Sequence, residues 1–72
     1  MDIQLQHKNK PLAYIFIEER ISVKNTLYFL AETVKFNEKT QENEKVKFEN
    51  IPASEFSKWW MEYEKDGWEI CE

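Results

Sequence analysis

One aromatic stripe in the last third of the chain constrains its fold more than any other feature. The stripe has spacings of three, one and three residues, which fit one face of a helix, and it consists of Phe56, Trp59, Trp60 and Tyr63. Pro52 is tolerated in a first helical turn, and either Asn50 or Ser54 can act as the N-cap. Gly67, the single glycine, follows where a helix commonly ends in a left-handed residue. A helix with one apolar face has to pack that face against another element.

The apolar segments before this helix indicate β-strands. Alternation or enrichment in aromatic and β-branched residues predicts strands over residues 2–6, 12–20, 26–36 and 45–49, with a polar loop over 37–44. The segment 26–36 also fits a helical stripe through Leu27, Leu30, Ala31 and Val34, but its content of strand-forming residues favours a strand. Residues 68–71 alternate again and predict a short terminal strand or a tail packed on the sheet.

These elements predict a single small α+β domain over residues 1–72. A mostly antiparallel four-stranded sheet is followed by one C-terminal helix and a short terminal strand or tail, in the order ββββα. Pairing Val34 with Phe48, and Phe36 with Val46, makes a hairpin with four apolar side chains on one face. On this register the core face beneath the helix holds Ala13, Ile15, Ile17, Tyr28, Leu30, Val34, Phe36, Val46 and Phe48.

The same register leaves a second face that is also apolar. It carries Leu12, Tyr14, Phe16, Leu27, Phe29 and Ala31, beside Thr33 and the lysines 35, 45 and 47. One helix cannot cover both faces of a sheet. The second face is therefore closed by sheet curvature and the tail residues Trp68 and Ile70, or it is covered by a second copy, a protein partner or a ligand.

Composition argues against an enzyme. The chain has one cysteine, Cys71, and one histidine, His7, near opposite ends, and its single glycine cannot build a phosphate-binding loop. We therefore expect no catalytic residues, no cofactor and no metal. The longest apolar run is six residues, Leu12 to Ile17, far short of the roughly 20 that span a bilayer, and so no membrane contact is expected. With a free thiol and an acidic pI, we expect a cytoplasmic protein.

Charge is distributed unevenly along the chain. Residues 1–36 have a net charge of +1, whereas residues 37–72 have a net charge of −5. Acidic surfaces steer association with basic partners, so the helix and tail are candidate binding positions, with residues Glu55, Glu62, Glu64, Asp66 and Glu69. Tyr14, Phe16 and Phe29 on the second sheet face are the other candidates. We expect a non-enzymatic accessory regulator or inhibitor that docks on a protein, with a homodimer as the competing arrangement.

A nucleic-acid alternative follows from the order of the elements. The ββββα order resembles single-strand-binding coactivator domains, in which a curved sheet is followed by a helix. That resemblance implies base stacking on Tyr14 and Phe16 and phosphate contacts from the four lysines at positions 8, 10, 45 and 47. The net charge of −4 disfavours this alternative, because proteins that bind phosphate backbones generally carry a basic surface.

Overall fold

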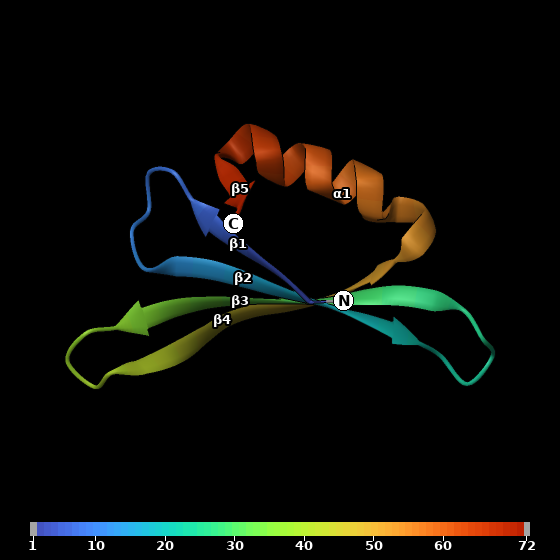
Figure 1. The fold of residues 1–72 in the computed structure, drawn as a ribbon, viewed down its shortest axis with the longest axis horizontal. Coiled ribbons are helices and arrows are strands. Elements are labelled where there is room, and N and C mark those ends of the chain that lie inside the picture. Colours follow the sequence, from blue (N-terminus) through green and yellow to red (C-terminus); the bar gives the residue numbers. More distant parts are fainter. Residues whose placement is uncertain (1, 72) are drawn as a thin grey trace.

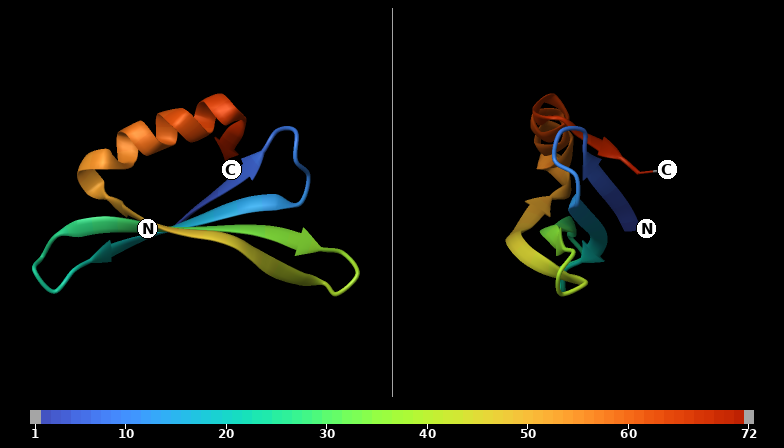
Figure 2. Two further views of the ribbon diagram at one scale, coloured as in Figure 1. Left: turned by 180° about the vertical axis from the view of Figure 1, so that it is seen from behind. Right: turned by 90° about the vertical axis from the view of Figure 1, so that its left-hand side faces the viewer.

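The computed structural model describes residues 2–71. Five strands and one helix follow one another: β1 Asp2–His7, β2 Ala13–Ile21, β3 Leu27–Asn37, β4 Glu42–Pro52, α1 Ala53–Asp66 and β5 Trp68–Ile70. The strands form one antiparallel sheet in the order β4-β3-β2-β1-β5. Helix α1 crosses one side of the twisted sheet, and none of residues 2–71 forms a helix on the other side (Figure 1, Figure 2). The predicted α+β class and the ββββα order with a short terminal strand are confirmed.

The structure decides the type of one element and corrects the length of another. The segment 26–36 is strand β3, so the helical alternative for it is wrong. Strand β4 spans eleven residues from Glu42 to Pro52, whereas the sequence predicted a loop up to residue 44 and a strand of five. The first half of β4 is polar because it lies at the edge of the sheet, where hydrogen bonds to β3 hold the backbone and an apolar side is not required.

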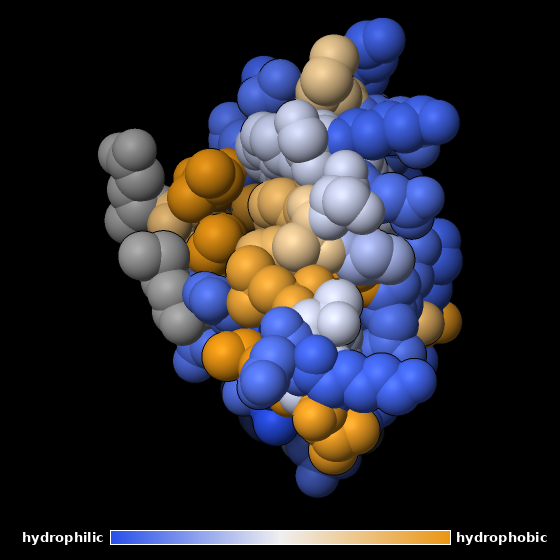
Figure 3. All heavy atoms as spheres, turned by 90° about the vertical axis from the view of Figure 1, so that its right-hand side faces the viewer, coloured by the Kyte–Doolittle hydropathy of each residue, from blue (hydrophilic) through white to orange (hydrophobic). Residues whose placement is uncertain are grey.

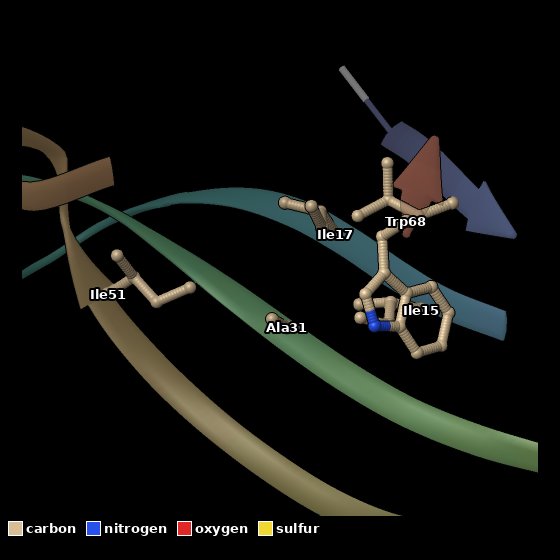
Figure 4. Close-up of a cluster of buried hydrophobic side chains, with 6 residues drawn as sticks. Ile15, Ile17, Ala31, Ile51 and Trp68 are labelled. Atoms are coloured by element: carbon tan, nitrogen blue, oxygen red, sulfur yellow. The ribbon is translucent and has the colours of Figure 1, made fainter. Parts of the chain in front are cut away.

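The core lies between α1 and one face of the sheet. The buried cluster consists of Leu5, Ile15, Ile17, Ala31, Ile51 and Trp68, several of which are shown in Figure 4. All four residues of the aromatic stripe pack against this cluster, so the predicted helix face is confirmed. Ile15 and Ile17 are buried in it and Ala13 packs beside it, as the sequence predicted. No side chain of α1 is fully buried, because the helix crosses the sheet as a single outer layer.

The predicted β3–β4 register is wrong. Phe48 pairs with Glu32, and Val34 pairs with Lys45, across a β-bulge between Thr33 and Val34. The observed partner of Phe48 is thus two residues from the predicted one, and a shift of two keeps each side chain on its own face of the strand. The error in the faces lies between β2 and β3, because Ile17 pairs with Ala31 instead of sharing its face with Leu30. Phe29 and Ala31 lie beneath the helix, whereas Leu30 and Phe48, predicted as core, lie on the opposite face. Val34 is buried, but it lies outside the core cluster.

Both ends of α1 are determined by backbone conformation. Pro52 occupies the N-cap position without a side-chain hydrogen bond, so neither Asn50 nor Ser54 caps the helix as predicted. Gly67 ends the helix at φ +114°, a left-handed conformation, and its N–H donates to the carbonyl of Glu64 at 3.1 Å. A Cβ on Gly67 would lie 2.8 Å from Cε1 of His7. The predicted glycine stop is confirmed, and the structure adds the close approach of His7.

Candidate protein-binding face

We define the open face as the side of the sheet opposite α1. Cross-strand pairs place Gln4, Phe16, Glu32 and Phe48 in one row across β1 to β4. Asp2, Glu18, Leu30 and Asn50 form the neighbouring row. Tyr14 lies one row further along, with its ring nearly parallel to that of Phe16 at a centroid distance of 6.4 Å. The open face is thus an aromatic surface with acidic residues between its rings.

The centre of the open face is hollowed. The hollow has a volume of about 440 Å³, and its lining includes Phe16, Leu30, Phe48, Asp2, Glu18 and Glu32. Phe48 is 60% exposed and Phe16 is 37% exposed. Two aromatic rings therefore stay accessible around a hollow that three carboxylates line.

The charges of the open face are only partly paired. Lys45 Nζ lies 3.4 Å from Glu32 Oε1, and Arg20 donates to Glu18 Oε2 at 2.7 Å. Both ion pairs are at least partly exposed, so each contributes little to stability and can be exchanged for contacts with a partner. The acids Asp2, Glu18 and Glu32 outnumber the cations Arg20 and Lys45, which leaves this face net negative.

The structure divides the predicted candidates between separate surfaces. Tyr14 and Phe16 lie on the open face as predicted. Phe29 does not, because its ring packs on the ring of Phe56 at 4.3 Å beneath the helix. The prediction that placed Phe29 on the second face is wrong, because β3 pairs with β2 so that Ala31 and Phe29 share the helix side with Ile17. Phe48 takes its place as the exposed aromatic residue.

The five predicted acidic residues do not form one surface. Glu69 lies on β5 opposite Gln6 and accepts a hydrogen bond from its amide at 3.2 Å, on the open-face side of the sheet. Glu55, Glu62 and Asp66 share one flank of α1, and Glu64 lies about 160° from Glu62 around the helix. The outermost ridge between the flanks carries Lys58, Met61 and Lys65 instead of acids. The helix surface is therefore mixed in charge.

One signal in the sequence could have found Phe48. Helix α1 begins directly after β4, so the last inward-facing residue of β4 has to be next to the helix. That residue is Ile51, and counting back in steps of two assigns Glu49 to the helix side and Phe48 to the open face. The alternation of Val46 and Phe48 predicted the strand but not which of its faces was buried.

A polar network explains why Glu49 faces the helix. Its Oε2 accepts hydrogen bonds from Trp59 Nε1 at 3.0 Å and from the hydroxyl of Tyr63 at 2.9 Å. Lys47 Nζ lies 3.1 Å from the other carboxylate oxygen of Glu49. Burial by itself raises the pKa of Glu49, but the hydrogen bonds from Trp59, Tyr63 and Lys47 outweigh it and leave the pKa below its ordinary value. The network gives the polar ends of two core aromatics a partner.

His7 has a structural position. It lies one residue beyond the strand predicted over residues 2–6, but it is the last residue of β1 and is buried. Its Nδ1 accepts from the N–H of Asn9 at 3.0 Å, so Nε2 carries the proton that is donated to the carbonyl of Asp66 at 2.8 Å. Its ring also meets that of Trp68 edge-on at 5.0 Å. His7 thus holds the C-terminal end of α1 on the sheet.

The structure also bears on metal binding and on membrane insertion. Within residues 2–71, no group of three or more His, Cys, Asp or Glu side chains is placed to hold a metal ion. The one helix in this range is neither long nor apolar enough to cross a membrane. Figure 3 views the end of the molecule that carries the β2–β3 turn and shows hydrophobic residues on the surface among hydrophilic ones. Ile21 and Val23 are exposed at this turn.

The lysines of the nucleic-acid alternative are not gathered beside Tyr14 and Phe16. Lys45 lies on the open face but pairs with Glu32, and Lys47 lies on the helix side against Glu49 and Tyr63. Lys8 and Lys10 lie in the turn between β1 and β2.

Comparison of the chain with protein-family models, with curated proteins and with solved structures finds no match.

Proposed function

We propose that the protein is a non-enzymatic binding module, an accessory regulator or inhibitor that docks on a protein partner through its open face. The observation that carries this proposal is the row Phe16–Glu32–Phe48, in which two accessible aromatic rings flank a carboxylate on the uncovered side of the sheet. Aromatic residues are enriched in the energetically dominant parts of protein interfaces, and uncovered apolar patches commonly mark such interfaces.

The chemistry of the open face favours a partner that is both basic and apolar. Asp2, Glu18 and Glu32 line the hollow, and the whole chain has a net charge of −4. A lysine or arginine of the partner can pair with these carboxylates while its aliphatic stem or a neighbouring apolar side chain packs on Phe16 and Phe48. We further propose a cytoplasmic location, because Cys71 is a free thiol and the chain is acidic.

The test compares one substitution on each of the two candidate surfaces. F48E places a charge on the open face, and M61E places the same charge on the outermost ridge of α1, where Met61 is 56% exposed. Affinity-tagged wild type and both variants are incubated with extract of the source cells, cross-linked and analysed by mass spectrometry. We expect F48E to lose a protein that wild type and M61E retain, with cross-links to β2, β3 or β4. If F48E retains every protein that wild type binds, the open face is not the docking surface. If M61E alone loses the partner, the helix is.

One observation favours the single-stranded nucleic-acid alternative, namely the near-parallel rings of Tyr14 and Phe16 on an accessible sheet face. Fluorescence anisotropy with a labelled oligothymidine at low salt tests it. Because the lysines are dispersed and the open face is net negative, we expect no binding. Binding that weakens steeply with salt and is lost in Y14A would establish the alternative over the protein partner.

A further inference from the structure

A second hollow lies on the helix side of the sheet, beyond the C-terminal end of α1. Its volume is about 480 Å³, and its lining includes Lys10, Ala13, Thr33, Lys35, Val46 and Trp68. These residues come from the β1–β2 turn and from strands β2, β3, β4 and β5. We call it the lysine hollow. It lies on the opposite side of the sheet from the open-face hollow, and the two have no lining residue in common.

The lysine hollow exists because the sheet carries small side chains where the helix no longer covers it. Ala13 and Lys35 pair across β2 and β3, and Thr33 occupies the next helix-side position on β3. Helix α1 ends at Asp66 and the chain turns back through Gly67 into β5, so its aromatic stripe stops at Tyr63. Neither Ala13 nor Thr33 is large enough to fill the space that remains. Val46, at 67% exposure, forms the edge of the hollow on β4.

The charged residues that line the lysine hollow are all cations. Lys10 and Lys35 belong to the lining, no Asp or Glu does, and neither lysine makes an ion pair with another of residues 2–71. The lining of the open-face hollow has the opposite charge, because it includes three carboxylates and no lysine. In a chain with a net charge of −4, an apolar hollow edged by two unpaired lysines is complementary to an anion.

Trp68 is a nearly buried residue of the lining of this hollow. The residue is 6% exposed, and its indole N–H donates to no acceptor in the described part of the chain. No buried side-chain nitrogen or oxygen in that part lacks a hydrogen-bond partner. The indole N–H therefore reaches solvent, although almost all of the residue is covered.

We propose that the lysine hollow binds a small organic anion that has a flat aromatic ring. The ring packs among Ala13, Val46 and Trp68, and the anionic group, a carboxylate or its equivalent, lies between the ammonium groups of Lys10 and Lys35. The volume lies within the range typical of small-molecule sites, about 300–1,000 Å³. This ligand site is independent of the proposed docking face on the other side of the sheet.

The test uses a charged probe and its uncharged counterpart, 2-naphthoate and 2-naphthalenemethanol. Both are titrated into the full chain while backbone and indole N–H signals are followed by two-dimensional ¹H–¹⁵N NMR. We expect 2-naphthoate to bind about tenfold more tightly than the alcohol, because two ammonium groups favour the anion. The largest shifts are expected at the Trp68 indole and at residues 13, 33, 35 and 46. Equal affinity for both probes, or shifts located elsewhere, would overturn the proposal.

Two matched pairs of variants separate the site from general charge effects. The double variant K10Q/K35Q is expected to weaken 2-naphthoate binding about tenfold, whereas K58Q/K65Q removes two lysines from the outer ridge of α1 and leaves binding unchanged. V46E places a carboxylate in the hollow and is expected to abolish binding. V23E makes the same change at the fully exposed β2–β3 turn and has no effect. If K10Q/K35Q or V46E binds 2-naphthoate as wild type does, the anion site is refuted. The ¹H–¹⁵N spectrum of each variant also shows whether that variant is folded, which is the control for these comparisons.

Discussion

At the scale of single residues, Glu49 shows how a half-buried carboxylate can serve aromatic residues that pack on the core. It accepts hydrogen bonds from Trp59 and Tyr63 of α1 and pairs with Lys47 of β4, so one side chain joins the helix to the edge strand. No pattern in the sequence singled it out, because Glu49 is one acid among fourteen. Only the strand face that it occupies distinguishes it from a solvated surface residue.

We predict that E49Q destabilises the fold by about 1–2 kcal/mol at neutral pH, because hydrogen bonds to a charged acceptor are replaced by weaker ones. The pKa of Glu49 is lower in the folded chain than its ordinary value of 4.5. Its contribution is therefore complete above that value and is lost as pH falls through the lower, folded-state pKa. Urea unfolding followed by tryptophan fluorescence should show the difference between wild type and E49Q shrinking as the solution is acidified below about pH 4.5. An equal difference at all acidic pH values would contradict this assignment.

Gly67 and His7 are the second residue-scale feature. The left-handed φ of Gly67 is one reason for a glycine, and the 2.8 Å that would separate an added Cβ from the His7 ring is another. We predict that G67A costs about 1–3 kcal/mol of unfolding free energy. In an H7A background the close contact is absent, so the same substitution should cost less, which a double-mutant cycle measures. Strict additivity would show that backbone strain alone makes Gly67 necessary.

At the scale of elements, the helix was predictable and the pairing of the strands was not. The stripe from Phe56 to Tyr63 and the glycine stop are local signals, with every residue within four positions of the next, and both are confirmed. The β3–β4 register depends on a bulge at Thr33/Val34 and on a turn shorter than predicted. The pairing of β3 with β2 places Phe29 in the core and leaves Phe48 on the surface, the reverse of the prediction, which altered the candidate site.

The helix assignment predicts a contrast between two α1 substitutions. Met61 lies on the outer ridge, so M61E should change the free energy of unfolding by less than about 0.5 kcal/mol. Phe56 packs on Phe29 and on the core cluster, so F56A should cost about 2–4 kcal/mol. Chemical denaturation of both variants checks the contrast. A large loss of stability in M61E would show that this face of α1 is covered.

At the scale of the whole molecule, the two sides of the sheet differ. One side is covered by α1 and carries the lysine hollow beyond the C-terminal end of the helix. The other side is uncovered and carries the acidic hollow. The sheet has one long edge, β4, and one short edge, the three-residue β5. Lys45, Lys47 and the bulge interrupt the β4 edge, and such features commonly prevent edge-to-edge association.

We predict that the chain is a monomer at physiological salt, because two copies packed through their open faces would bring Asp2, Glu18 and Glu32 against the same acids. Size-exclusion chromatography with light scattering should give a mass near 8.8 kDa. A stable mass of twice that value, reduced to the monomer by F48E, would instead assign the open face to a homodimer.

The sequence by itself determined the element types, their order, the apolar face of the helix and its glycine stop, because each of these follows from spacing within a few residues. It also placed Ala13, Ile15 and Ile17 toward the core. Only the tertiary structure decided which face of β3 and β4 the helix covers, that His7 is buried and Glu49 faces the helix, and which aromatic residues remain accessible. Alternation with a period of two is identical for both faces of a strand, so the choice between them depends on register, on the bulge and on the direct junction of β4 with α1.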